Sequence, residues 1–106
     1  MPAAFKNYQS RAIGTTNTQI GLYAVPSSTN AMLLTLSVSN ITNAAITANV
    51  YHNNGTNNTS IVSLAPIPVG GSIEINKIAL QTGHSVYVCT NTASSADAIL
   101  SVMELT

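Results

Sequence analysis

The feature that most constrains the fold is an alternation of apolar and polar residues with a period of two. It is longest in residues 31–52, where AMLLTLSVSN is followed by ITNAA and ITANVYH. Alternation over seven or more residues is typical of a β-strand with one buried face. The residues expected to face a core there are Met32, Leu34, Leu36, Val38, Ile46, Ala48 and Val50. Residues 40–43, rich in turn-forming side chains, separate the halves, so the stretch predicts an antiparallel hairpin.

Further runs with strand character occupy residues 18–25, 59–65, 72–76, 84–90 and 97–105. The turn signals between them are Pro26, Asn54, Gly55, Pro66, Pro68, Gly70, Gly71 and Gly83. Short strands at a spacing of about 8–12 residues, with turns between them, favour an all-β sandwich or barrel. The sequence therefore predicts a single antiparallel β-sandwich of seven strands, or eight if the N-terminal segment pairs. Ig-like and jelly-roll-like connections both remain open.

The alternation also predicts which side chains are buried. We expect burial of Leu34, Leu36, Val38, Ile46, Val50, Val86 and Val88, and partial or full exposure of Thr35, Ser37, Thr47 and Asn49. The last run, residues 97–105, is apolar on both faces. Ile99 and Met103 lie on its outer face, and we expect a second copy of the chain to cover them.

The chain is unusually poor in charge. Charged residues make up 6% of the sequence and the formal net charge is zero, whereas an ordinary globular protein has roughly 25% charged residues. Near-zero net charge favours association, so we expect partners to cover much of the surface; a Thr/Asn-rich monomer is the alternative. No basic patch is present to bind nucleic acid, and no apolar run reaches the roughly 18 residues that a membrane span needs.

The N-terminal segment, residues 1–17, shows no clean period, and we treat it as a separate arm before the sandwich domain of residues 18–106. It holds two of the three cations, Lys6 and Arg11, and two of the five aromatic residues, Phe5 and Tyr8. Frayed termini tend to lack aromatic anchors, so we expect this arm to order on a partner surface. The main alternative is a strand added to the domain's own sheet.

The sequence offers little for catalysis or for a cofactor. His52, His84 and Cys89 have no metal-ligand spacing, and a zinc site needs three or four ligands. The three carboxylates, Glu74, Asp97 and Glu104, each lie at a strand end or on an outward register, and no paired acid and base is evident. We therefore expect no enzyme activity, no metal and no cofactor.

Three tyrosines, Tyr23, Tyr51 and Tyr87, fall on the polar register of different strands. Tyrosine has a large apolar body with a polar tip and is enriched at interfaces. Ordinary surface tyrosines on a sheet are the alternative.

Four segments carry a family resemblance: LYAVP at residues 22–26, APIPVGGS at 65–72, LQTGHSV at 80–86 and AILSVMEL at 98–105. Together they resemble a group of roughly 100-residue β-sandwich virion proteins of tailed bacteriophages. The likeness covers residues 18–106. His84 stands where an Asp is commoner in that group, so a role of that acid does not carry over.

The resemblance implies a virion structural protein, and first of all a capsid decoration (cement) protein that binds across capsomers of the head. Its partners would be the major capsid protein or other virion proteins, together with copies of itself, with a trimer favoured. The alternatives are a neck or tail component, or a carbohydrate-binding module on a fibre. The residues expected to bind partners are Phe5, Lys6, Tyr8, Arg11, Ile99 and Met103.

Overall fold

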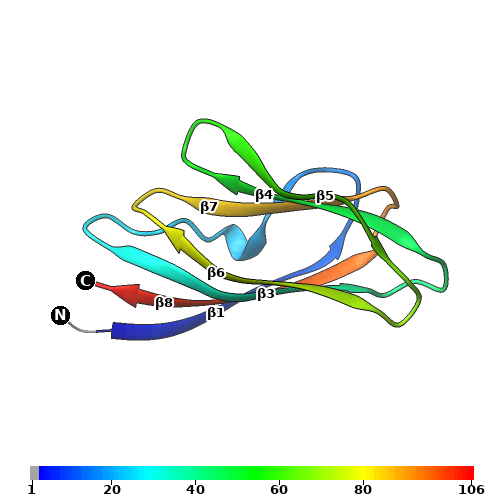
Figure 1. Cartoon of the computed structure of the whole chain (residues 1–106), viewed down its shortest axis with the longest axis horizontal. Helices are drawn as coiled ribbons and strands as arrows, with labels where there is room; N and C mark the ends of the chain where they lie inside the picture. The colour runs from blue at the N-terminus through cyan, green and yellow to red at the C-terminus, as the bar shows by residue number, and fades with distance from the viewer. Residues whose placement is uncertain (1–2) are drawn as a thin grey trace.

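The computed structural model describes residues 3–106, which form two four-stranded antiparallel sheets packed face to face (Figure 1). The first sheet contains, in spatial order, β1 (Ala3–Ile13), β8 (Ala96–Leu105), β3 (Asn30–Asn40) and β6 (Ser72–Leu80). The second contains β2 (Thr18–Gln19), β7 (Ser85–Thr90), β4 (Ile46–Asn53) and β5 (Asn58–Ile67). The predicted eight-stranded all-β sandwich is confirmed.

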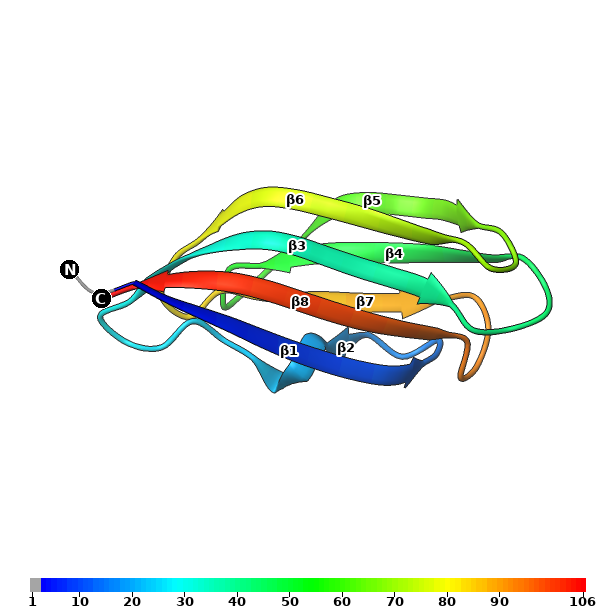
Figure 2. The ribbon, with the colours of Figure 1, turned by 90° about the horizontal axis from the view of Figure 1, so that it is seen from below.

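The strand order shows which kind of sandwich this is. β1 pairs with β8, β2 with β7, β3 with β6 and β4 with β5, so the two numbers of each pair add up to nine. This is the order of one long hairpin, bent between β4 and β5 and rolled up, with β8 against β3 and β7 against β4 closing the sheets. Eight strands in two sheets with this order make a jelly roll. Figure 2 shows the first sheet in front of the second.

The predicted central hairpin is wrong, because β3 and β4 lie in different sheets. β3 pairs with β6 and β8, whereas β4 pairs with β5 and β7. Residues 41–45 cross from one sheet to the other. Either arrangement buries one face of each strand, so alternation alone does not distinguish a hairpin from a crossing.

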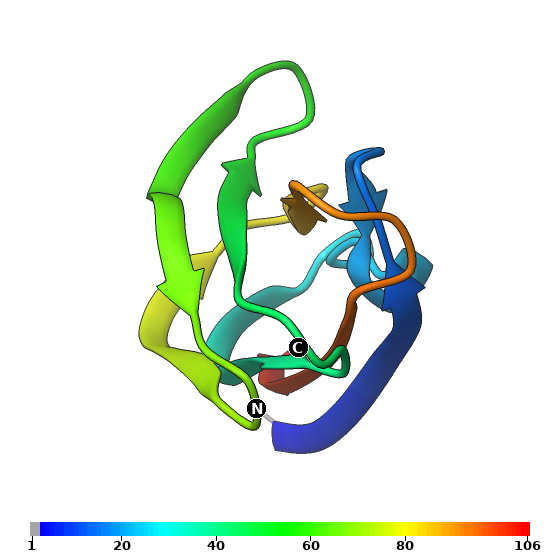
Figure 3. The same ribbon diagram turned by 90° about the vertical axis from the view of Figure 1, so that its right-hand side faces the viewer.

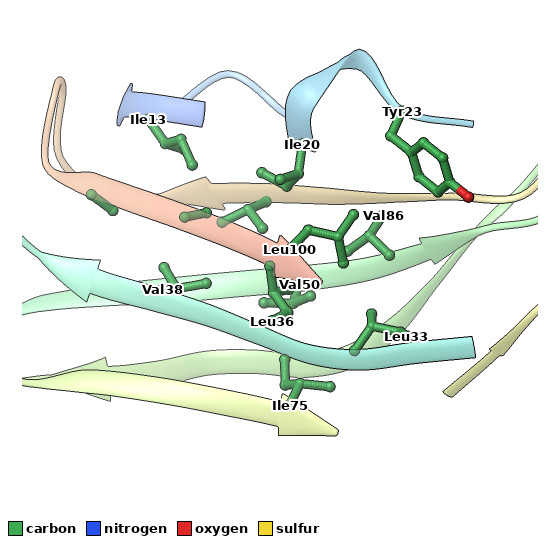
Figure 4. Close-up of a cluster of buried hydrophobic side chains, with 14 of the residues drawn as sticks. Ile13, Ile20, Tyr23, Leu33, Leu36, Val38, Val50, Ile75, Val86 and Leu100 are labelled. Carbon is green, nitrogen blue, oxygen red and sulfur yellow. The ribbon is translucent and has the colours of Figure 1, made fainter. Parts of the chain in front are cut away.

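The core lies between the two sheets (Figure 4). Leu36, Val38, Ile46, Val50, Val86 and Val88 are buried, and Thr35, Ser37, Thr47 and Asn49 are not, as predicted. Leu34 is the exception: it is half-buried, while its neighbour Leu33 is in the core. The pairing of β3 with β8 shifts by one residue between Leu33 and Thr35. This bulge reverses the facing of the first part of β3, so Met32 points outward.

The N-terminal segment is an edge strand of the first sheet, not a separate arm. β1 pairs with β8 from Ala3 to Ile13, with a bulge after Ser10. Its inward side chains include Lys6, Tyr8 and Ser10, which are too polar to show an apolar period in the sequence. The first two residues of the predicted arm lie outside the described part of the chain.

Only the start of the strand predicted at residues 18–25 forms, as β2, and a short 3-10 turn, η1 (Ile20–Leu22), follows it. It lies against the inner side of β1, where the Gly21 N–H donates a 2.8 Å hydrogen bond to Ser10 Oγ. Gly21 has a φ of 62°, and a Cβ added there would lie 2.4 Å from Tyr8 Cβ. Only glycine therefore fits at this approach. The turn also carries Tyr23 into the core, although the sequence placed that residue on the polar register.

The connections gather at the two ends of the long axis. Figure 3, which looks along this axis, shows the end that holds the β1–β2, β3–β4, β5–β6 and β7–β8 connections. Asn40, buried at the end of β3, ties the β3–β4 connection to the β5–β6 connection: its Nδ2 donates to the backbone oxygens of Ala44, Ile67 and Pro68 at 2.8, 3.1 and 3.3 Å. We call this the loop end, and the opposite one the termini end.

Candidate interaction surface

The outer face of the first sheet carries a row of apolar side chains across all four strands. Phe5 pairs with Met103, Met103 with Met32, and Met32 with Ala79, so one residue of each strand contributes. We call these four residues the apolar row. Side chains directly opposite on one face lie about 4.5–5.5 Å apart at Cβ, so they form a continuous strip. Phe5 is 74% exposed and Met32 39%.

The rest of this outer face becomes more polar toward the loop end. Beside the apolar row, on the termini side, lies Leu105, which is 37% exposed. On the other side the next rows are Asn7, Ser101, Thr35 and Asn76, then Gln9, Ile99, Ser37 and Glu74. Ile99 is 46% exposed within this polar part. The face thus has an apolar half near the termini and a polar, weakly acidic half near the loops.

The structure brings three of the six predicted partner-binding residues onto this outer face: Phe5, Ile99 and Met103. Lys6 and Tyr8 point to the inner side of β1, so they support the fold and do not form the outer face. Arg11 is exposed at the bulged loop end of β1.

Met32, Ala79 and Leu105 belong to the surface but were missed by sequence reasoning. Met32 was placed in the core because Leu33, the one apolar exception to the alternation, was not interpreted as a bulge. Ala79 and Leu105 become significant only through their positions beside the apolar row, which depend on strand register.

Beneath β1, a buried carboxylate fixes the edge of the first sheet. Glu104 is only 4% exposed; its Oε2 accepts a 2.6 Å hydrogen bond from the Tyr23 hydroxyl, and its Oε1 lies 3.0 Å from Lys6 Nζ. The Tyr23 hydrogen bond, with help from Lys6, lowers the pKa of Glu104 despite its burial. Glu104 in turn raises the pKa of Lys6, and burial raises that of Tyr23.

The ring of Tyr8 stacks on Tyr23 with ring centroids 4.3 Å apart. Lys6 and Tyr8 on β1 therefore contact a buried acid of β8 and an aromatic ring that follows η1. These contacts bind the edge strand to the sandwich.

The outer face of the second sheet is different in chemistry. Tyr51 and Tyr87 are cross-strand neighbours there, between Gln19 and Ser60, and the Tyr87 hydroxyl donates a 3.3 Å hydrogen bond to Gln19 Oε1. Both tyrosines are half-buried. Of the three tyrosines predicted on the polar register of their strands, Tyr51 and Tyr87 lie on an outer face, whereas Tyr23 is buried.

The two histidines meet at the termini end. His52 Nε2 and His84 Nδ1 lie 2.8 Å apart, and burial lowers the pKa of His52, with a smaller contribution from His84. Within residues 3–106 no group of three or more His, Cys, Asp or Glu side chains could hold a metal ion, and no pocket is found. No helix in this part of the chain is long and apolar enough to cross a membrane.

No known protein-family model matches the chain, and no curated protein matches it by sequence. Solved structures do match. A chain of the acid-stable capsid structure of Helicobacter pylori bacteriophage KHP30 superposes with a TM-score of 0.58 at 10% identity, covering 98% of this chain and 87% of that one. A chain of the Bacillus endospore appendages, described as disulfide-linked pili, gives 0.56 at 13%, covering 98% and 88%. Such low identities show the fold alone, and this fold occurs in both assemblies.

Proposed function

We propose that this chain is a structural protein of a bacteriophage virion, bound to the head as a decoration (cement) protein. The observation that carries the proposal is the outer face of the first sheet, where an apolar row lies on a rigid sheet of a nearly uncharged protein. Exposed apolar patches on a soluble domain mark surfaces that other proteins cover. The phage-protein resemblance of residues 18–106 and the jelly-roll fold agree with it.

A cement protein acts by adding buried surface between the proteins it bridges. Burial of apolar surface contributes about 25 cal/mol per Å², although area does not convert directly into affinity. A modest contact repeated many times over a shell would resist the outward pressure of packaged DNA. The partners in this proposal are the major capsid protein and neighbouring copies of the chain, and a trimer remains a prediction from the resemblance.

A disulfide-linked pilus, the other assembly in which this fold occurs, fits the chain poorly. A polymer joined end to end through disulfides needs two cysteines in each subunit, one for each neighbour. Residues 1–106 contain one cysteine, Cys89. It could join two copies but could not extend a chain.

The experiment that tests the proposal is protein quantification in purified particles whose genome encodes the chain. A cement role predicts a copy number comparable to that of the major capsid protein, and heads that release DNA at a lower temperature when the gene is deleted. A few copies per particle would indicate the neck or tail instead. Absence from particles would overturn the virion role.

The second candidate, a carbohydrate-binding module, is favoured by the row that contains Tyr51 and Tyr87. A glycan array would test it with wild-type protein and a Tyr51→Ala, Tyr87→Ala variant. Glycan binding by the wild type that the variant loses would favour this candidate, and no binding would remove it.

A further inference from the structure

We propose that the outer face of the first sheet binds the same face of a second copy of this chain, through a two-fold axis parallel to the strands. In this pair β8 of one copy lies over β3 of the other, and β1 lies over β6. The contact requires no virion and is tested in solution, whereas the proposed function is tested in particles, so failure of one can be told from failure of the other.

The order of the strands makes this face able to pair with itself. The centre of β1, β8, β3 and β6 lies between β8 and β3. A two-fold axis there places β1 of one copy over β6 of the other, and β8 over β3. Each row of residues keeps its position along the strands. Met103 of each copy then lies over Met32 of the other, and Phe5 over Ala79. The apolar row packs on the apolar row.

The other two-fold arrangement, with the axis across the strands, is worse. It reverses the strand direction, so the apolar half of one copy lies over the polar half of the other. Phe5 would then face Gln9, and Met32 would face Ser37. Burying polar groups opposite apolar ones without hydrogen bonds costs free energy.

Charge gives a second, independent reason for the parallel arrangement. Lys6 with Glu104 is the only ion pair within residues 3–106, so Arg11 and Glu74 are both without one there. Arg11 lies at the loop end of β1, and Glu74 lies near the loop end of β6. When β1 of one copy covers β6 of the other, each Arg11 comes close to Glu74 of the second copy, twice per pair. The two Glu74 side chains lie at opposite edges of the contact.

The available area matches a specific but moderate contact. Four strands of nine to eleven residues, at about 3.4 Å per residue and about 4.8 Å between strands, give a face of about 650 Å² in projection. A standard interface buries about 800 Å² on each partner. The whole face is therefore needed, and we expect a pair that forms at micromolar concentrations.

A flat face that binds itself must make an isologous contact, and such a contact closes at two copies. A threefold ring would need two different complementary patches. The geometry of this face therefore supports a dimer, and the trimer that the resemblance favoured would need a further surface.

Sedimentation velocity over a concentration series tests the pair, with the full chain in a buffer that keeps Cys89 reduced. We expect the wild type to form dimers and Met103→Asp to remain a monomer, because the variant places a charge within the apolar row. Ser60→Asp, on the outer face of the second sheet, is the matched control and should dimerise like the wild type. If Met103→Asp does not fold, Phe5→Asp replaces it, since that side chain is 74% exposed.

A charge exchange tests the orientation. Arg11→Glu and Glu74→Arg should each weaken dimerisation by about 2- to 30-fold, as expected for two exposed ion pairs per dimer. The double variant should return to within about twofold of the wild type. A monomeric wild type at high micromolar concentration, or dimers of Met103→Asp, would overturn the pairing. Failure of the double variant to recover would overturn the parallel arrangement.

Discussion

The two faces of β1 differ in what they contribute, although their residues alternate along one strand. The inward side chains Lys6, Tyr8 and Ile13 contact a buried acid, an aromatic ring and the core. The outward side chains Phe5, Asn7 and Gln9 are exposed and extend the outer face of the first sheet; Asn7 donates a hydrogen bond to Ser101 Oγ and accepts one from Gln9. One edge strand can therefore hold the fold together with one face and offer a binding surface with the other.

The largest loss of stability is expected when both faces of β1 are removed at once. A chain that starts at Gly14 loses the β8 pairing, the Lys6 partner of Glu104 and the buried side chain of Ile13, which is 2% exposed. Removal of a separate arm, as the sequence predicted, would leave the melting temperature nearly unchanged. With β1 in the sheet we expect loss of cooperative folding, because a domain has only about 5–15 kcal/mol of stability. Circular dichroism melting checks it; a cooperative transition within a few degrees of the wild type would contradict it.

The next test affects only the inner face of β1, through Gly21. Gly21→Ala combines a positive φ with a Cβ 2.4 Å from Tyr8 Cβ, so we expect a loss of about 3–4 kcal/mol of unfolding free energy. Gly70→Ala is the matched control: its φ is 75°, but a Cβ there meets nothing within 4 Å. We expect that variant to lose about 1 kcal/mol. Urea denaturation measures both, and equal losses would show that the approach to β1 does not constrain the fold.

A third test uses the acid beneath β1 and the direction of its pKa shift. Glu104→Gln should lose about 1–3 kcal/mol at neutral pH, since it removes the charge but leaves an amide oxygen for the Tyr23 hydroxyl. Glu74→Gln, which changes an exposed glutamate of the same sheet, should stay within about 0.5 kcal/mol.

The Glu104→Gln variant also allows a test of how stability depends on pH. The pKa of Glu104 is lowered in the folded state from its usual 4.5. The unfolded state therefore binds the proton more readily, and the Glu104 contribution is present above pH 4.5 and is lost as the pH falls through the folded value. The difference in melting temperature between the wild type and Glu104→Gln should shrink below about pH 4.5. A constant difference would contradict the assigned pair.

How much the sequence revealed depended on whether a property is local. Burial of Val50 and Val88 follows from alternation along one strand and was predicted correctly. The pairing of strands depends on residues far apart in the chain, so β3 and β4 were wrongly joined into a hairpin. Leu34 was misplaced because one inserted residue reverses the facing of a strand.

The candidate surface shows the same limit. Ile99 and Met103 were predicted on a covered outer face because β8 is apolar on both sides. Phe5 was also predicted to bind a partner, but as part of an arm, and Met32 was assigned to the core, so neither was expected beside Met103. The apolar row crosses four strands, so it can be recognised only when the register between those strands is known.

The smallest expected effect on stability belongs to the outer face of β1. Phe5→Ala should change the unfolding free energy by no more than about 0.5 kcal/mol, because the ring is already 74% exposed in the isolated chain. Tyr8→Ala, three residues further along the same strand, removes a stacked and half-buried ring and should cost about 2–4 kcal/mol. The order should reverse for self-association, where Phe5→Ala weakens the pair and folded Tyr8→Ala does not. Urea denaturation and sedimentation of both variants check this. The different roles of the two faces of β1 would be contradicted if Phe5→Ala were the more destabilising variant, or if both variants paired equally well.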